Sequence, residues 1–425
     1  MASTPTAVMP VYTGDAAAIF LNTLQAPYET PDAALITKVG ELLAQVRTGG
    51  DFALEGICQA LGDATPRTLM PDDVEVQNAI ATVDPAVRAV IERSAERVQR
   101  FGEATLKGAQ AVCVSDDAVE SGLRWQPVAS VGCYVPGGRY PLPSTALMTA
   151  ITAKVAGVPE IWIVSPLLGP EVLLAGQLAG VTGYRQIGGA HGVAALAYGT
   201  ETITPVTMIV GPGNAWVTEA KRQLQGVIGI DALAGPSEVV LIADADANPD
   251  WVAVDLLAQA EHDPNARAYC LVDSLEQAQA IQQAVDQALS ILPLAGFLKE
   301  SLAHSGIVVL ENLEACAKAA NTLAPEHLAL MVANPDALTP YLTDYGALFM
   351  GYNTPVPVGD YMAGPNHTLP TARAARFSGG LTPWTFLRPQ TWMRVRSAPL
   401  ICQDASLFAA TEGLEAHRAS AAARL

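Results

Sequence analysis

Short apolar segments alternate with amphipathic ones through most of the chain, and this alternation constrains the fold more than any other feature. In residues 128–224 we expect strands at 128–135, 161–164, 184–187 and 208–210, and helices at 144–156, 170–178, 191–198 and 215–224. In a second series we expect strands at 239–243, 268–272, 306–310, 328–332 and 347–350, and helices at 251–259, 275–289, 314–321 and 335–344. Strands that alternate with helices form right-handed βαβ units, so the sequence predicts an α/β fold with parallel sheets.

Chain length and one turn-rich segment predict how these units are divided. A chain of 425 residues exceeds the size of a single hydrophobic core. The turn-rich residues 231–238 separate the two series. We therefore expect two Rossmann-like domains, one formed by residues 129–237 and the other by residues 1–128 and 238–380. The helical N-terminal segment, with helices expected at 31–46, 51–61, 71–81 and 84–101, belongs to the second, and residues 381–425 form a tail that ends in a helix at 406–423.

Charge and cysteine content argue against several classes of protein. The chain has 24 basic and 42 acidic residues, a net charge of −18, which disfavours binding to nucleic acid or to an anionic membrane. The first 14 residues lack the basic and apolar regions of a signal peptide, and prolines and glutamates interrupt the apolar stretch at 155–181. The six cysteines form no CxxC pair, so we expect reduced thiols in a cytoplasmic protein.

The dipeptide Glu326-His327 stands in an almost wholly apolar stretch. Burial disfavours charged side chains, so an ionisable pair in such surroundings needs a reason. One interpretation is a general base beside a second acid/base group. The other is a histidine capped by a neighbouring carboxylate at a strand end, which by itself is the better explanation of a lone dipeptide.

Three expected strand-to-helix junctions are rich in glycine, at 136–138, 188–190 and 211–214. Glycine lets the backbone approach a ligand closely, and the following helix N-terminus attracts anions. In an open parallel sheet, ligands bind at the carboxyl ends of the strands. None of the three loops has the G-x-G-x-x-G spacing of dinucleotide-binding loops, and glycines at such junctions are usually only turns.

Further polar residues have weak individual signals. Gln259 and His262 lie on one face at a helix end, where a structural cap is the simpler explanation, and Asp360 fits an Asx-turn. Glu412 and His417 fit the solvated face of the last helix. The polar loop around residue 367 could face a site, and the histidine at 304 has no expected role. Together one glutamine, two histidines and one aspartate suit zinc or a similar divalent ion, which would polarise a substrate hydroxyl, but nothing in their spacing brings them together.

Several long motifs resemble the histidinol dehydrogenase family, from about residue 31 to the C-terminus. The matching stretches are VGCYVPGG (131–138), GPGNAWVTEAKR (211–222), DALAGPSE (231–238), DLLAQAEHDP (255–264), APEHL (324–328) and GDYMAGPNHTLPT (359–371). They are long, ordered and specific. The resemblance implies a zinc-dependent homodimer that oxidises L-histidinol to L-histidine with two NAD through bound histidinal, the last step of histidine biosynthesis.

The resemblance also implies roles for individual residues. Those matching zinc ligands are Gln259, His262, Asp360 and His417, with His417 supplied by the partner subunit, so that the tail crosses the dimer. Those matching the acid/base pair are Glu326 and His327. The expected substrate contacts are Ser237, Gln259, His262, His327, Asp360, Glu412 and His417. The expected cofactor contacts are Tyr134, His191 and Asn214.

The implied mechanism has two oxidations at one site. His327 removes the hydroxyl proton in the first, and Glu326 activates water for the second while the aldehyde stays bound. The chain departs from the family at His191, where the family usually has glutamine in the loop GGAQA. Histidine can still donate a hydrogen bond, but its reach and charge differ.

Two alternatives stay open at this point. A paralogue on the same scaffold could oxidise another hydroxy compound, such as a sulfonated diol, with the same zinc and base residues. A non-catalytic ligand-binding homologue is the other, and retention of all four ligands and of Glu326 and His327 argues against it.

Overall fold

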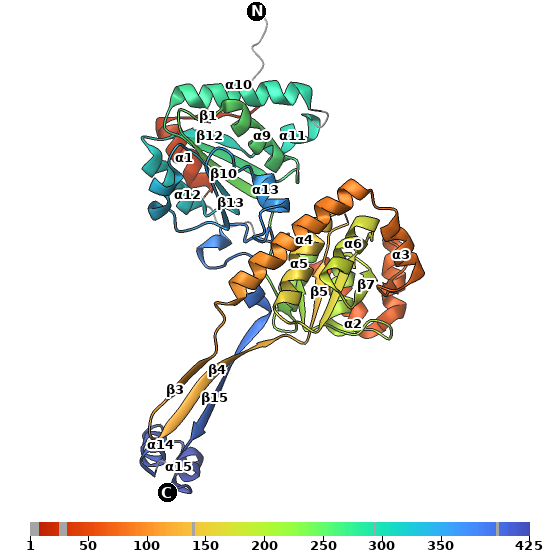
Figure 1. Ribbon diagram of the computed structural model, residues 1–425, viewed down its shortest axis with the longest axis vertical. Helices are drawn as coiled ribbons and strands as arrows, with labels where there is room; N and C mark the ends of the chain where they lie inside the picture. Colours follow the sequence, from red (N-terminus) through yellow and green to blue (C-terminus); the bar gives the residue numbers. More distant parts are fainter. Residues whose placement is uncertain (1–7, 25–31, 138–140, 293–294, 397–398) are drawn as a thin grey trace, which may run out of the picture.

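The structure, a computed structural model, describes residues 8–24, 32–137, 141–292, 295–396 and 399–425. It has two lobes, each built on a six-stranded sheet, and an extended three-stranded arm (Figure 1). The α/β class with parallel sheets is thereby confirmed. Two expected features, Pro31 in the first turn of the N-terminal helix and Gly138 in the first glycine-rich loop, lie outside the described residues.

The first sheet has the strand order β2-β7-β6-β5-β8-β9, and only β2 is antiparallel to its neighbour. Its strands are β2 (Arg67–Leu69), β5 (Ser130–Tyr134), β6 (Glu160–Ser165), β7 (Gly183–Gln186), β8 (Met208–Val210) and β9 (Gly229–Ile230). The helices that follow them are α5 (Pro143–Val155), α6 (Pro170–Ala179), α7 (Gly189–Tyr198) and α8 (Ala215–Leu224). Buried aliphatic side chains fill both faces, as expected of a parallel sheet covered on two sides.

The second sheet has the order β1-β12-β11-β10-β13-β14, and all its strands are parallel. The strands are β1 (Val11–Tyr12), β10 (Glu238–Ala243), β11 (Arg267–Val272), β12 (Gly306–Val309), β13 (His327–Met331) and β14 (Ala347–Met350). The helices around it are α1 (Gly14–Leu24), α9 (Pro249–Ala260), α10 (Leu275–Ile291), α11 (Ala295–Leu302), α12 (Leu313–Leu323) and α13 (Val356–Tyr361).

The N-terminal helices cover the first sheet, not the second. Helix α2 (Ala33–Leu61) packs on α7 and α8, α3 (Val74–Ala81) on α6, and α4 (Pro85–Leu106) on α5 and α6. The expected grouping of residues 1–128 with residues 238–380 is therefore wrong for these helices, and only β1 and α1 join the second sheet. An amphipathic pattern shows that a helix has an apolar face, but it does not say which sheet that face covers.

The arm was not predicted. It consists of antiparallel strands β3 (Val112–Ser115), β4 (Val119–Pro127) and β15 (Leu387–Val395), and it carries α14 (Pro399–Thr411) and α15 (Glu415–Ala422) at its tip (Figure 1). These strands bury few side chains, so they lack the apolar runs of the two central sheets. The expected single helix at 406–423 is wrong, because Gly413 has a φ of 74° and separates α14 from α15.

One other expected element differs for a similar local reason. The helix expected at 335–344 is a pair of 3-10 turns, Pro335–Ala337 and Thr339–Tyr341, since Pro340 has no N–H to continue a helix. The two N-terminal helices expected on either side of the glycine pair are present and share the label α2, with a kink between them at Gly50 (φ 51°, ψ −139°). The six cysteines are free thiols. Within the described chain, no helix has the length and apolar character needed to cross a membrane.

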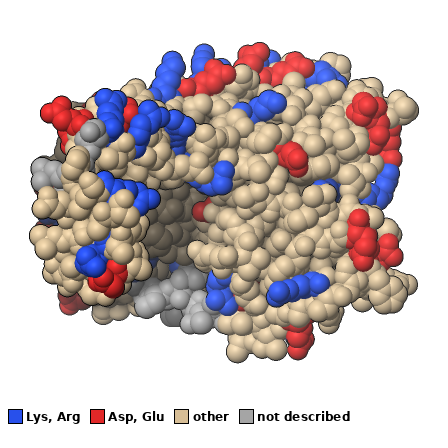
Figure 2. Space-filling model, turned by 90° about the horizontal axis from the view of Figure 1, so that it is seen from below, with Lys and Arg blue, Asp and Glu red and all other residues tan. Residues whose placement is uncertain are grey.

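The segment after α13 joins the lobes. Ser94 Oγ in α4 donates to the Tyr361 carbonyl at 2.5 Å, and Asn366 Nδ2 donates to the Met148 carbonyl in α5 at 2.7 Å. Gly364 has a φ of 106°, and an added Cβ would lie 2.9 Å from the Arg97 carbonyl oxygen of α4. The molecule seen from below is hollowed, and side chains other than Lys, Arg, Asp and Glu form most of the surface around the hollow (Figure 2).

Gly211→Ala should destabilise the first lobe more than Gly226→Ala does. Both glycines have positive φ, 109° and 97°, but a Cβ at Gly211 would lie 2.2 Å from the Tyr134 carbonyl oxygen whereas one at Gly226 meets open space. Gly226→Ala should cost roughly 1–2 kcal/mol of backbone strain, and Gly211→Ala about 1–3 kcal/mol more because of the clash. Urea unfolding measures both, and equal losses would contradict the close approach.

Candidate active site

The amino ends of β10 and β13 bring Glu326 and His327 to one point. The strands pair in parallel with Val239 opposite His327. The backbone N–H of Glu238 donates to Glu326 Oε2 at 2.9 Å, and His327 Nδ1 donates to the Glu238 carbonyl at 3.3 Å. Glu326 and His327 are 6% and 5% exposed. The main chain of Glu238 thus fixes both side chains in the interior.

The turn into β13 directs the pair. Helix α12 ends at Ala324, which has a φ of 46° in the left-handed region, and Pro325 follows. Proline disfavours continuation of the helix, so the chain turns sharply and enters the sheet at His327. On the other side of the ring, His327 Nε2 lies 3.5 Å from Oδ1 of Asp360, which is buried on α13. The Asx-turn suggested for Asp360 is replaced by a short helix.

Burial and neighbouring charges set the proton affinities of this group. Burial raises the pKa of Glu326 to about 7, although the adjacent histidine opposes it. Burial alone would lower the pKa of His327, but the carboxylates of Glu326 and Asp360 outweigh it and raise the pKa to about 9. Burial alone would raise the pKa of Asp360, but the hydrogen bond and the charge of His327 hold this pKa below its ordinary value. Buried groups with such shifts are suited to proton transfer.

Gln259 and His262 lie at the end of α9. Asn248 caps the start of α9 by accepting from the Asp250 N–H at 2.9 Å. Gln259 is 2% exposed, and its Nε2 has no hydrogen-bond partner in the described structure. The charge of His262 acts to lower the pKa of Asp360, so the two side chains lie near each other.

His367 and Glu238 also belong to this site, although few features of the sequence point to either. His367 Nδ1 donates to the Asp360 carbonyl at 2.9 Å, and its other nitrogen lies 3.4 Å from Thr145 Oγ1. Burial lowers the pKa of His367. The polar run around residue 367 was the signal for this histidine. Glu238 acts through its main chain, which no side-chain pattern reveals.

Glu412 and His417 lie elsewhere in the chain. Both are exposed, Glu412 between α14 and α15 and His417 on α15, at the tip of the arm in Figure 1. Within the described chain, no group of three or more His, Cys, Asp and Glu side chains is arranged to hold a metal ion. A single subunit thus brings together three of the four expected ligands at most, counting the Gln259 amide.

The expected cofactor residues gather at the carboxyl edge of the first sheet. Tyr134 ends β5, and its hydroxyl accepts from the Gly189 N–H at 3.0 Å. Asn214 follows β8 and caps α8, accepting at 3.1 Å from the N–H groups of Trp216 and Val217. His191 is 1% exposed, and its Nε2 lies 3.4 Å from Asp63 Oδ2.

A buried ion pair stabilises the same edge of the first sheet. Lys221 Nζ lies 2.5 Å from Asp231 Oδ1 and donates to the Gly211 carbonyl at 3.0 Å. The Gly211 N–H donates to Asp231 Oδ2 at 2.7 Å. The segment that leaves the first lobe at residue 231 is thereby tied to the glycine-rich loop, and it then leads directly to Ser237 and Glu238.

Comparison with known proteins decides the family. The family model for histidinol dehydrogenase matches residues 27–425. The chain belongs to the histidinol dehydrogenase family. It is 44% identical over 395 residues to histidinol dehydrogenase 1 of Trichormus variabilis, covering 91% of each chain. It is 43% identical over 434 residues to histidinol dehydrogenase of Rhizobium meliloti, covering 96% of this chain and 98% of the relative.

A solved structure agrees over the whole fold. The crystal structure of histidinol dehydrogenase from Elizabethkingia anophelis superposes with a TM-score of 0.92 at 30% identity and covers 99% of each chain. The two lobes and the arm are thus the architecture of a histidinol dehydrogenase. The alternative of a paralogue specialised for another hydroxy compound is not favoured by these matches.

Glu238→Gln should flatten the pH dependence of stability. Burial, aided by the charge of Glu326, raises the pKa of Glu238 from 4.5 to about 7, so the folded state binds this proton more tightly than the unfolded chain. The stability contributed by the proton is complete below about pH 4.5 and is lost as pH rises through about 7. Denaturant unfolding at a series of pH values measures the slope.

The matched control is Glu300→Gln, which removes an exposed carboxyl from α11. It should keep the wild-type slope. A Glu238→Gln protein whose stability falls as steeply with pH as the wild type would contradict a tightly held proton on Glu238.

Proposed function

We propose that this chain oxidises L-histidinol to L-histidine in two NAD-dependent steps through bound histidinal, in the cytoplasm, as the last step of histidine biosynthesis. The observation that carries the proposal is the buried Glu326-His327 pair, held by the main chain of Glu238, in a member of the histidinol dehydrogenase family. Two groups of different proton affinity beside one another suit two successive oxidations at one site.

The residues present fit a zinc ion. Gln259 is buried and offers an amide oxygen, and His262 and Asp360 lie near each other. Gln259, His262, Asp360 and the partner subunit's His417 would hold the ion with oxygen and nitrogen donors that zinc accepts. When bound, the ion would polarise the substrate hydroxyl and make its proton easier to remove.

His327 is the base of the first oxidation in this proposal. Because Nδ1 donates to the Glu238 carbonyl, Nε2 is the ring atom that takes the hydroxyl proton when the ring is neutral, a form that grows as pH rises towards about 9. The carboxylates of Glu326 and Asp360 raise the proton affinity of the ring and hold its orientation. NAD, when bound, would supply the hydride acceptor for each of the two oxidations.

Glu326 activates water for the second oxidation. Burial brings its pKa to about 7, so the carboxylate is a stronger base than an exposed glutamate and can take a proton from water that attacks the aldehyde. Ser237, next to Glu238, and Glu412 of the partner subunit complete the substrate contacts with Gln259, His262, His327, Asp360 and the partner's His417. The buried setting keeps the aldehyde from solvent.

The first lobe, centred on residues 129–237, binds NAD in this proposal, and the second lobe binds zinc and substrate. Tyr134 and Asn214 lie at the carboxyl ends of β5 and β8, where the strand order of the first sheet reverses and where nucleotides bind in open parallel sheets. His191 reaches the cofactor only if its contact with Asp63 opens, since the ring is 1% exposed.

The proposal includes a homodimer with a shared site, and the exposed apolar side chains of the arm support it. Residues 381–425 carry Glu412 and His417 to its tip, and exposed apolar side chains lie along it, including Met393 at 76% and Phe408 at 69% exposure. Covering such side chains with a second copy is favourable. The tail then supplies its two residues to the partner's site.

The test of the function is turnover of L-histidinol with NAD. We expect two NADH for each histidinol, loss of activity after treatment with a chelator, and recovery when zinc is returned, because the substrate oxygen needs a polarising ion. A sulfonated diol such as 2,3-dihydroxypropane-1-sulfonate is the control substrate. The proposal is contradicted if zinc-loaded protein does not turn over histidinol or if it prefers the diol.

The shared site is tested by mixing two inactive variants, His417→Ala and His262→Ala. A mixed dimer contains one site with all four ligands intact, so activity should return to about a quarter of the wild-type level if subunits exchange at random, which is half of the dimers with one of two sites active. Mass spectrometry confirms the mixed dimer. Absence of recovery in confirmed mixed dimers argues that each site belongs to one subunit.

A further inference from the structure

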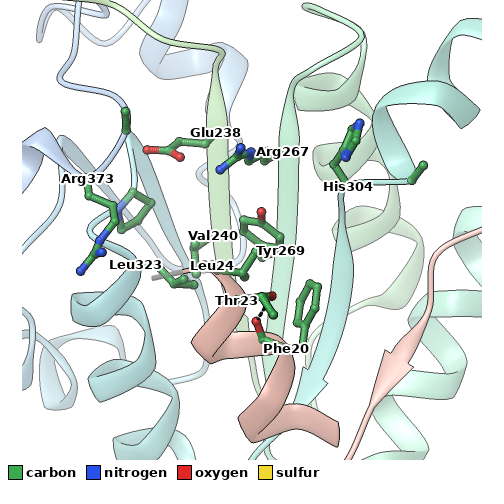
Figure 3. Close-up of a pocket in the computed structure, with 13 residues that line it drawn as sticks. Phe20, Thr23, Leu24, Glu238, Val240, Arg267, Tyr269, His304, Leu323 and Arg373 are labelled. Carbon is green, nitrogen blue, oxygen red and sulfur yellow. Dashed lines mark hydrogen bonds between the residues drawn. The ribbon is translucent and has the colours of Figure 1, made fainter. Parts of the chain in front are cut away.

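A pocket lies behind the candidate active site, on the other face of the same strands. It has a volume of about 350 Å³, and its lining includes Phe20, Leu24, Glu238, Arg267, Tyr269 and His304 (Figure 3). Successive residues of a strand point to opposite faces. Glu238 and Val240 of β10 therefore line the pocket, while Val239, opposite His327, belongs to the other face.

Glu238 is the buried charge of this pocket. It is 9% exposed, and its Oε1 has no hydrogen-bond partner in the described structure. The carboxylate is otherwise held by backbone N–H groups of Ala372 and Arg373, two consecutive residues with left-handed φ of 55° and 63°. A buried carboxylate oxygen without a partner is costly, so its position at a cavity points to a donor supplied by a ligand.

Arg267 supplies the opposite charge. It begins β11 directly opposite Glu238 in the parallel register, and it lines the same pocket. Among the described ion pairs, none joins these two residues within 4.0 Å, although the charge of Arg267 acts to lower the pKa of Glu238. A guanidinium and a carboxylate side by side, each facing the cavity, can bind the two ends of a zwitterion.

Apolar side chains make up one part of the lining, beside the polar side chains of Thr23, His304 and Arg373. Phe20 and Leu24 come from α1, and Val240, Tyr269 and Leu323 come from the sheet and α12. Figure 3 shows these side chains below Glu238 and Arg267, on one side of the charged groups. The volume is at the lower end of the range for small-molecule sites and suits a single amino acid.

We propose that this pocket is a second binding site, for a free α-amino acid with an apolar or aromatic side chain. The ammonium donates to Glu238 Oε1, the carboxylate accepts from Arg267, and the side chain packs on Phe20, Leu24 and Tyr269. This site goes beyond the proposed oxidation. It adjoins the candidate active site at Glu238, whose main chain holds Glu326 and whose side chain lines the pocket.

The test is calorimetric titration of the full-length protein with L-phenylalanine. The matched probes are phenethylamine, which lacks the carboxylate, and 3-phenylpropionate, which lacks the ammonium. Each lost charged hydrogen bond should weaken binding about tenfold or more. Equal affinity for the three compounds, or no heat from L-phenylalanine at millimolar concentration, would overturn the proposal.

Variants locate the site. Arg267→Met and Glu238→Gln should each weaken binding of L-phenylalanine about tenfold or more, with folding checked by circular dichroism. Thr23→Trp, at an exposed position of the lining, should block the pocket without touching the buried charges. Glu300→Gln and His262→Asn are the controls and should bind as the wild type does.

The outcomes separate this site from the proposed oxidation. Binding that persists in Thr23→Trp and Arg267→Met overturns the pocket as its location, and binding lost in His262→Asn assigns it to the candidate active site instead. A protein that binds L-phenylalanine as described but does not oxidise histidinol refutes the proposed function alone.

Discussion

The pairing of β10 with β13 is the interaction on which the candidate active site depends. It brings the main chain of Glu238 against Glu326 and His327 and gives each of them a backbone partner. Placing an acidic side chain and a histidine in an apolar interior is unfavourable unless each finds a hydrogen bond and a charge partner. Here the sheet supplies the hydrogen bonds, and the two side chains with Asp360 supply the charges. The position of the pair is therefore as rigid as the sheet.

The expected site residues lie at opposite edges of the two sheets. Tyr134 and Asn214 stand at carboxyl ends of the first sheet, whereas Glu326 and His327 stand at the amino ends of β10 and β13. The rule that ligands bind at carboxyl ends describes the first group only. The segment at 231–237, tied to the glycine-rich loop by Asp231, leads from one edge to the other, and Thr371 accepts from the Gly235 N–H at 2.5 Å on its way. A short connection thus leads from the edge that carries Tyr134 and Asn214 to the edge that carries Glu326 and His327.

Most of the two central sheets follows from the sequence because buried parallel strands are short apolar runs bounded by turns. Strand β8, helix α8 and strand β14 were predicted to the residue. The arm was not predicted because its strands are largely exposed and lack apolar runs. The packing of α2–α4 was not predicted because the periodicity of a helix does not show which sheet its apolar face covers. The Glu326-His327 pair is recognisable from its motif, but its hydrogen bonds come from a backbone 88 and 89 residues away in the chain. His417 and Glu412 show the same limit: their spacing in sequence does not place them at the tip of the arm (Figure 1).

The side chains of β10 alternate between the two faces of the sheet, and this alternation limits which mutations the region tolerates. Glu238 and Val239 face opposite sides of the sheet, one towards the pocket and the other towards the face of His327. Replacing a side chain alters one face and leaves the backbone bonds in place. Inserting or deleting one residue in 234–238 would shift the register and turn every side chain of β10 to the wrong face. We therefore expect evolutionary change in this segment to proceed by substitution at constant length rather than by insertion or deletion.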